Sequence, residues 1–219
     1  MNKLFTKKYR DKVQIEVIKL LNNTDLVNSL LSSSPRAIGD AVQNYLEDNF
    51  VKCLPKELIK DYNNQFARRS MADFAFTDIN SNYYAVDSKT HNVDTAFNMP
   101  NLTSVERLSR FYEDHENYFT ILMTSYSISK QKKPIFTSCD FVPIEMLDWN
   151  CLTLGALGWG QIQIANSNYI SINETNTRKK WMLQLCDNLE IFYPNEIAKI
   201  NERINRFKSI RKFWEKLPD

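Results

Sequence analysis

The sequence of 219 residues predicts an α/β fold with a mixed central β-sheet flanked by helices. Early and late segments carry apolar residues at three- and four-residue spacing, which is typical of amphipathic helices. The middle of the chain is instead rich in aromatic and β-branched residues in short segments, which favours strands. One helical segment is embedded among these strands. This order of helices, strands and helices is typical of an α/β or α+β domain.

The individual elements follow from periodicity and turn residues. Helices are expected at residues 8–21, 38–51 and 101–112. A further helical stretch over residues 177–214 should be broken near Tyr193 and Pro194, because proline removes a helix donor. Strands are expected at residues 73–77, 83–90, 118–127, 134–142 and 161–164. No internal repeat or long low-complexity linker divides the sequence, so residues 1–219 should form a single domain.

Composition excludes several classes of protein. The net charge is only +2, from 28 basic and 26 acidic residues, which argues against a histone-like DNA coat. Two histidines are poor material for a zinc site or an HNH-type nuclease. No run approaches the roughly 18 apolar residues of a membrane span, and residues 1–10 lack the apolar core of a secretory signal. Four cysteines without paired spacing favour reduced thiols in the cytoplasm.

Two aspartates and a lysine form the most informative pattern. Alternation along the strand at residues 83–90 puts Asp87 and Lys89 on one face. If Asn80 is the centre of the preceding hairpin turn, residues whose numbers sum to 160 lie opposite each other, and Asp73 then faces Asp87. Two carboxylates would be neighbours across the ladder, with an ammonium group two residues along.

Like charges placed opposite each other destabilise a sheet, so this arrangement favours a bound cation. Mg²⁺ takes one or two protein carboxylates together with water and phosphate oxygens. Lys89 could then orient a water molecule or stabilise developing negative charge. A solvated surface hairpin stays an alternative, because an acidic residue followed two places later by lysine is expected about twice by chance. The apolar strand context and the second aspartate at the matching position favour the site.

These residues resemble the PD-(D/E)xK nuclease motif, with Ala72 in place of the usual proline. The closer resemblance is to blunt-cutting type II restriction endonucleases of the EcoRV, HincII and SwaI kind. Residues 38–50 are similar to their early acidic helix, and residues 97–102 to the loop after the catalytic lysine. Residues 161–164 and 176–181 are similar to their late strand and the start of their C-terminal helix. The chain is somewhat shorter than most members, which leaves peripheral elements open.

The resemblance implies a restriction-endonuclease-like fold and a homodimer that uses Mg²⁺ to cut both strands of a palindromic duplex DNA site. Asp73 and Asp87 would ligate the metal, with the Ser88 carbonyl oxygen as a further ligand. Lys89 would act near the attacking water. Asp40, on the early helix, would approach the metal. Alternatively, Asp40 is a first-turn acid that the helix dipole favours.

Candidate DNA contacts lie in two regions. Asn98 and Asn101 could pair with base edges, and Met99 could wedge between base steps. Asn101 could also simply cap the next helix. The glycine-rich residues 155–160 predict a loop at the DNA surface with close backbone approach and unusual dihedral angles. It leads into four candidate polar readers: Gln161, Gln163, Asn166 and Asn168.

Alternation puts Gln161 and Gln163 on one face of their strand, with isoleucines opposite, a pattern that equally suits an edge strand facing water. Arg178 and Lys179, at the beginning of the last helical stretch, could reach phosphates. They could also form an ordinary solvated first turn.

The expected function is that of a type II restriction deoxyribonuclease that leaves blunt ends with 5′-phosphates. Two alternatives remain. One is a repair or recombination nuclease of the same fold that recognises DNA structure. The other is a non-catalytic DNA-binding protein whose acidic pair is vestigial.

Overall fold

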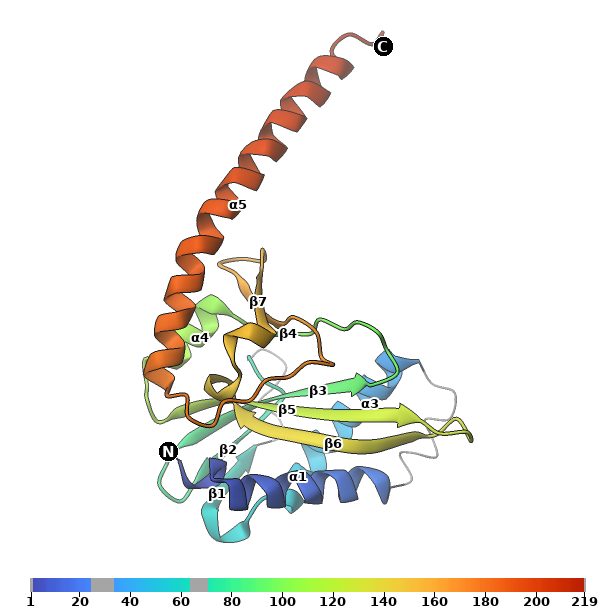
Figure 1. The fold of residues 1–219 in the computed structure, drawn as a ribbon, viewed down its shortest axis with the longest axis vertical. Helices are drawn as coiled ribbons and strands as arrows, with labels where there is room; N and C mark the ends of the chain where they lie inside the picture. The colour runs from blue at the N-terminus through green and yellow to red at the C-terminus, as the bar shows by residue number, and fades with distance from the viewer. Residues whose placement is uncertain (1, 25–33, 64–70, 219) are drawn as a thin grey trace. The chain divides into compact units, whose positions relative to one another are not determined.

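Five strands form the larger of two β-sheets in the computed structural model, which describes residues 2–24, 34–63 and 71–218 (Figure 1). In sheet order, they are β1 (Ile59–Asn63), β2 (Phe74–Asp78), β3 (Tyr83–Asn92), β5 (Asn117–Ile128) and β6 (Pro134–Pro143). β3 and β5 run parallel, whereas the other neighbouring pairs are antiparallel. The α/β class with a mixed sheet flanked by helices is confirmed. β1 lies in the region where the sequence carries only a weak signal.

The β2–β3 hairpin has the register that the sequence predicts. Phe74 pairs with Val86, and Thr77 pairs with Tyr83, so paired residue numbers sum to 160. The turn is held by Asp78, whose Oδ1 accepts hydrogen bonds from the backbone N–H groups of Asn80 and Asn82 at 2.8 and 2.9 Å. β2 begins at Phe74, opposite Val86, whereas β3 continues to Asn92. The second half of β3 therefore extends beyond its neighbour.

Two helices pack on the larger sheet: α1 (Lys7–Asn22) on β6, and α3 (Pro35–Asn49) on β3 (Figure 1). Aromatic rings join these layers. Phe50, just after α3, contacts Phe74 and Phe141 with ring centroids 5.0 and 5.6 Å apart. Phe5, just before α1, contacts Tyr84 at 5.8 Å. Burial of such rings is the main apolar stabilisation of this face, and it leaves the opposite face of β3 for polar side chains.

The smaller sheet is antiparallel, in the order β4 (Asn101–Ser104), β8 (Gln161–Ile164) and β7 (Leu152–Gly155). The strand expected at residues 161–164 is confirmed. The helix expected at residues 101–112 is wrong in its first turn: β4 precedes a shorter helix, α4 (Val105–Phe111). Pairing of Thr103 with Ile162 outweighs the local helical spacing there. Ser104 caps α4 by accepting a hydrogen bond from the Arg107 N–H, so Asn101 is not the cap.

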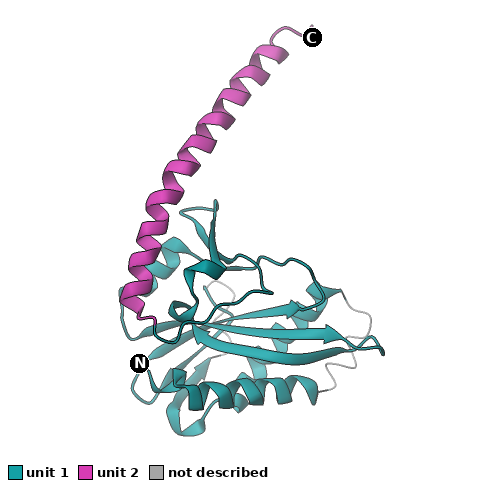
Figure 2. Cartoon of the chain, viewed as in Figure 1, with its two compact units in different colours: residues 1–175 teal, residues 176–219 magenta. Residues whose placement is uncertain are grey.

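The chain divides into two compact units, residues 1–175 and 176–219 (Figure 2). The second unit contains α5 (Arg178–Trp214), one continuous helix that includes Pro194. The break expected near Tyr193 is therefore wrong. Proline removes only one helix hydrogen bond, and Glu190, whose carbonyl group loses its partner, is an exposed residue. Whether the two units form one domain stays a prediction.

Short 3₁₀ helices complete the described structure, at Lys3–Phe5, Phe50–Cys53, Lys56–Leu58, Ile144–Met146 and Trp149–Cys151. Across the described ranges, none of the helices has the length and apolar character needed to cross a lipid bilayer.

Candidate active site

A carboxylate–lysine cluster lies beside the first residue of β2, at the point where β3 extends beyond that strand. The backbone N–H of Asp73 donates to the Val86 carbonyl oxygen at 2.9 Å, which extends the hairpin by one residue beyond Phe74. Asp73 thus stays next to β3, close enough for its charge to act on Asp87, and both residues line the same cavity of about 590 Å³. The two predicted carboxylates are brought together. Lys89 lies two residues along the same face of β3.

Asp87 is a buried carboxylate with one unsatisfied oxygen. Its side chain is only 7% exposed, and Oδ1 accepts a hydrogen bond from Lys89 Nζ at 2.7 Å. Oδ2 is buried and has no hydrogen-bond partner among the described residues. Burial raises the pKa of Asp87 to about 7, Lys89 opposes this rise, and the neighbouring charge of Asp73 adds to it. An acceptor in this state attracts a cation or a proton.

Asp73 is held in place from two sides. Its Oδ2 accepts a hydrogen bond from the Ser88 backbone N–H at 2.6 Å, and its Oδ1 accepts one from Gln43 Nε2 at 2.9 Å. Burial raises the pKa of Asp73, although the Ser88 N–H and Lys89 both lower it, and Glu47 raises it further. The carboxylate is therefore fixed in orientation as well as partly desolvated.

The Ser88 backbone supplies a further oxygen to this point. In a β-strand, the N–H and C=O groups of one residue point to the same edge. Because the Ser88 N–H points at Asp73, its carbonyl oxygen points to the same edge, beyond the end of β2. Two carboxylates, one of them with an orphaned oxygen, and one carbonyl oxygen are the hard ligands that Mg²⁺ prefers. The residues present therefore fit a magnesium ion.

The cluster is not a centre built wholly from protein ligands. Within residues 2–24, 34–63 and 71–218, no group of three or more histidine, cysteine, aspartate and glutamate side chains is placed to hold a metal. This composition is compatible with Mg²⁺, which keeps several waters and usually takes only one or two protein carboxylates. It is a poor fit to zinc, which takes three or four protein ligands.

Helix α3 reaches the cluster through a residue that the sequence analysis missed. Asp40 is exposed and lines a second cavity of about 420 Å³, together with Ser88 and Lys89. The contact with Asp73 comes instead from Gln43, whose Nε2 also donates to Glu47 Oε1 at 3.0 Å. Residues 40, 43 and 47 share one helix face by their spacing. That spacing is the signal that could have identified Gln43 and Glu47.

Two predicted DNA contacts lie at the cavities, one at each. Gln161 lines the cavity of Asp73 and Asp87, where Arg107 of α4 also lies. Asn98 lines the cavity of Lys89. Its backbone carbonyl oxygen accepts a hydrogen bond from the Ser167 N–H, and its Nδ2 donates one to Ser167 Oγ. Met99 is 40% exposed, as a side chain that enters a DNA groove would have to be. The cationic Arg107 had no distinguishing signal in the sequence.

Other predicted readers are occupied by contacts within the protein. Gln163 Nε2 donates to Asn101 Oδ1 at 2.6 Å, between β8 and β4. Asn168 hydrogen-bonds His91 Nε2 at 2.7 Å and donates to the Thr95 carbonyl oxygen at 2.8 Å. Asn166 accepts from the Asn168 N–H at 3.0 Å. These four side chains are engaged in shaping the loops around the cavities.

The glycine-rich loop has the backbone properties expected of it. Gly158 and Gly160 have positive φ angles of 59° and 119°, which side chains strongly disfavour. A Cβ atom at Gly155 would lie 2.7 Å from Gln163 Oε1, so this side chain packs directly on the glycine backbone. Gly158 lines the cavity of the two aspartates. The loop thus forms one wall of the candidate site.

Arg178 and Lys179 lie in the first turn of α5, in the second unit. Thr177 caps this helix by accepting a hydrogen bond from the Lys180 N–H at 3.2 Å. The contact of Arg178 and Lys179 with phosphate stays a prediction.

No protein-family model matches this chain, and no curated protein matches its sequence. The resemblance to restriction endonucleases therefore stays an expectation that rests on the residues themselves.

Proposed function

We propose that this protein is a Mg²⁺-dependent endonuclease that hydrolyses phosphodiester bonds in duplex DNA. The observation that carries the proposal is the Asp87 carboxylate, which is buried beside a second carboxylate and has one oxygen without a hydrogen-bond partner among the described residues. A buried acid beside a half-buried one destabilises a fold unless a cation or a proton neutralises the charge. Lys89 neutralises only one of the two charges.

The residues have distinct roles in this proposal. Asp73, Asp87 and the Ser88 carbonyl oxygen would hold the metal ion. When bound, Mg²⁺ supplies positive charge that acidifies a water ligand and neutralises charge on the phosphate. Lys89 would leave its contact with Asp87 Oδ1 to orient the attacking water or to stabilise the negative charge of the five-coordinate transition state. Gln43 would keep the Asp73 carboxylate at a fixed angle.

The substrate follows from the surroundings of the cluster. The cavity of Asp73 and Asp87 also contains the cationic side chain of Arg107 and the polar side chain of Gln161. The cavity of Lys89 adds Arg36 and Asn98. Cationic groups provide the phosphate contacts that dominate affinity for nucleic acids, and amides can read base edges. These features support a polynucleotide substrate over a small phosphate ester.

We further propose the specific biology that the resemblance implies. The enzyme would act as a homodimer on a short palindromic site, because a two-fold axis in the protein matches one in the DNA. It would leave blunt ends with 5′-phosphates. A cytoplasmic location is supported by the four cysteines, all within the described ranges and all without a disulfide.

The test is digestion of phage DNA by the purified protein with Mg²⁺, followed by sequencing of the fragment ends. We expect discrete fragments with a common sequence at their ends. Asp87→Ala and Lys89→Ala should abolish cutting while duplex binding largely survives. Lys7 and Asp11 provide the matched control, since they form an exposed lysine–aspartate pair at the same distance of 2.7 Å. Lys7→Ala and Asp11→Ala should cut normally.

Other outcomes separate the alternatives. Cleavage only at junctions or flaps would replace the restriction function with a structure-specific nuclease. DNA binding that is unaffected by Asp87→Ala, with no cleavage under any metal, would leave a non-catalytic binding protein.

A further inference from the structure

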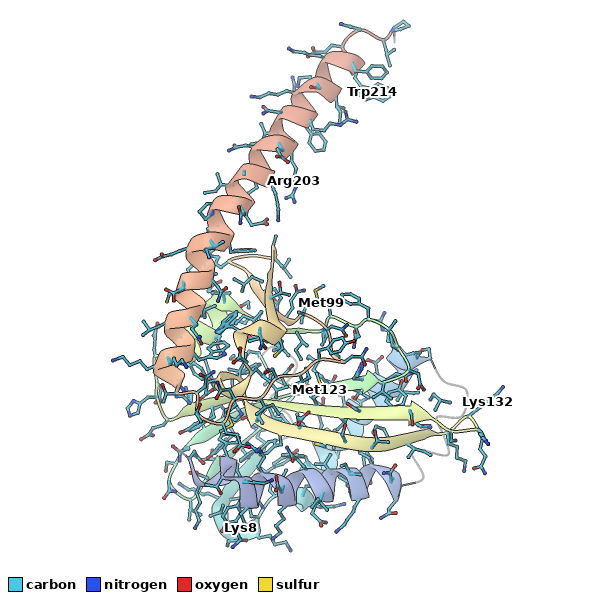
Figure 3. All side chains as sticks on the ribbon, viewed as in Figure 1. Lys8, Met99, Met123, Lys132, Arg203 and Trp214 are labelled. Carbon is cyan, nitrogen blue, oxygen red and sulfur yellow. The ribbon has the colours of Figure 1, made fainter. Side chains whose placement is uncertain are left out.

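The second half of α5 exposes a regular row of apolar side chains. Six residues form it, which we call the α5 seam: Tyr193, Ile197, Ile200, Ile204, Phe207 and Trp214. They are 40–68% exposed, and every residue from 197 to 209 is exposed. Figure 3 shows the side chains along this part of α5, with Arg203 and Trp214 labelled. Side chains of this size are normally buried, so an exposed contiguous row marks an interaction surface.

The spacing within the α5 seam identifies the kind of partner. The residues follow one another at alternating intervals of four and three, and Arg211 occupies the one remaining position of the series. This is the 3.5-residue period of a coiled coil, which is matched by a second helix with the same period. Among the described residues, helices α1 and α3 do not meet this requirement. The stripes of α1 (Val13, Val17, Leu21) and α3 (Ile38, Val42, Leu46) are already buried.

A groove on the seam has the composition of a coiled-coil hole. Ile200, Arg203, Ile204 and Phe207 line a depression of about 380 Å³, which Lys208 and Arg211 extend. The first four residues stand at positions i, i+3, i+4 and i+7, and these are the four positions that surround a knob from the facing helix. An isoleucine of a matching seam is the type of knob that such a hole accepts.

We propose that the α5 seam pairs with the α5 seam of a second copy of this chain, which forms a homodimer through a helical coiled coil. Six large side chains that are about half exposed offer roughly 600 Å² of apolar surface per helix, if each has about 200 Å² in all. This approaches the roughly 800 Å² per partner of a standard stable interface. Arg211 stands inside the series, between Phe207 and Trp214, and its charge is offset by Glu215, whose Oε1 lies 4.0 Å from its Nη1.

Sedimentation equilibrium of the full chain tests the proposal. We expect a dimer for the unmodified protein. The variant Ile200→Glu/Ile204→Glu places like charges along the seam and removes its apolar centre. The dissociation constant of its dimer should therefore rise about 100-fold, or the dimer should become undetectable. Ile191→Glu is the matched control, because Ile191 is 67% exposed on α5 but lies outside the seam. It should dimerise like the unmodified chain.

A charge-reversal rescue separates lost pairing from lost folding. Ile200→Lys/Ile204→Lys should also be monomeric alone, and an equimolar mixture with the glutamate variant should restore dimers. This rescue is expected for a parallel, in-register pair, in which position 200 faces position 200 and position 204 faces position 204 of the partner. The dimer should also survive Asp87→Asn, so its formation is independent of any nuclease activity.

Three results would overturn the proposal. The first is a monomeric unmodified chain at all accessible concentrations. The second is a dimer that persists in the glutamate variant, which would place the interface elsewhere. The third is a monomer whose seam residues become shielded from solvent only when vesicles of anionic phospholipid or duplex DNA are added. This result would assign the basic, apolar helix to those surfaces.

Discussion

The middle of β3 and the second half of α5 depart from the usual distribution of side chains in opposite ways. At β3, the carboxylates of Asp73 and Asp87 are desolvated, and one oxygen of Asp87 has no hydrogen-bond partner among the described residues. Along α5, isoleucine, phenylalanine and tryptophan side chains are exposed. Neither arrangement helps an isolated chain to fold. We propose that something outside the chain completes each region, a cation in the first case and a helix in the second.

The largest expected effect is at Asp87, where one substitution should lower activity and raise stability. Asp87→Asn should reduce Mg²⁺-dependent cutting by about 10³-fold or more, since the amide cannot serve as an anionic ligand. The same variant should melt at a higher temperature than the unmodified protein without metal, because it removes a buried charge beside Asp73. Cleavage assays and thermal melts on one preparation measure both. A variant that loses stability and activity together would indicate a purely structural carboxylate.

The next effect is a dependence of stability on pH. Folded Asp87 has a pKa of about 7, whereas an ordinary aspartate has a pKa of 3.8. Between these values the folded state binds more protons than the unfolded state, so the free energy of unfolding should fall as pH rises from about 4 to about 7. The contribution of Asp87 is at most about 4 kcal/mol, at 1.36 kcal/mol for each pKa unit.

Denaturant unfolding at several pH values measures this dependence without metal. Asp87→Asn should show a flatter profile, and saturating Mg²⁺ should flatten that of the unmodified protein as well. Identical profiles for the two proteins would contradict a raised pKa at Asp87.

A third prediction contrasts Asp87 with another buried carboxylate. Asp78 accepts hydrogen bonds from Asn80, from Asn82 and from the Tyr84 hydroxyl group, so both of its oxygens are satisfied. Asp78→Ala should therefore lower the free energy of unfolding by about 3 kcal/mol, because several donors lose their acceptor. Cutting by the fraction that remains folded should be unchanged. Asp61→Ala, at an exposed acid on β1, should change stability by less than about 0.5 kcal/mol.

The smallest expected effect is at the start of α5. Thr177 accepts a hydrogen bond from the Lys180 N–H, and Thr177→Ala should destabilise the helix by about 1 kcal/mol. Hydrogen exchange of the first-turn amides measures this change. Dimerisation through the α5 seam should be unaffected, because the seam begins about four turns further along the helix. Loss of the dimer in this variant would show that the seam depends on the whole helix.

Several local elements of this protein follow from its sequence alone. Alternation and a polar turn between residues 78 and 82 are local signals, and they determine the β2–β3 register that brings Asp73 beside Asp87. The helical periods of α1 and α3 and the short strand β8 are local in the same sense. The 3.5-residue spacing of the α5 seam is also present in the sequence, although only the exposure of its side chains distinguishes it from a buried stripe.

The tertiary structure decided what depends on contacts between distant residues. Residues 101–104 form a strand because β8 offers them backbone partners, which no local propensity encodes. Gln43 contacts Asp73, which is 30 positions further along the chain, because α3 packs on β3, and no local pattern encodes this contact. The burial that raises the pKa of Asp87 likewise results from the packed fold. Hydrogen-bond patterns within a segment are set by its own residues, whereas desolvation and long-range contacts exist only once the chain has folded.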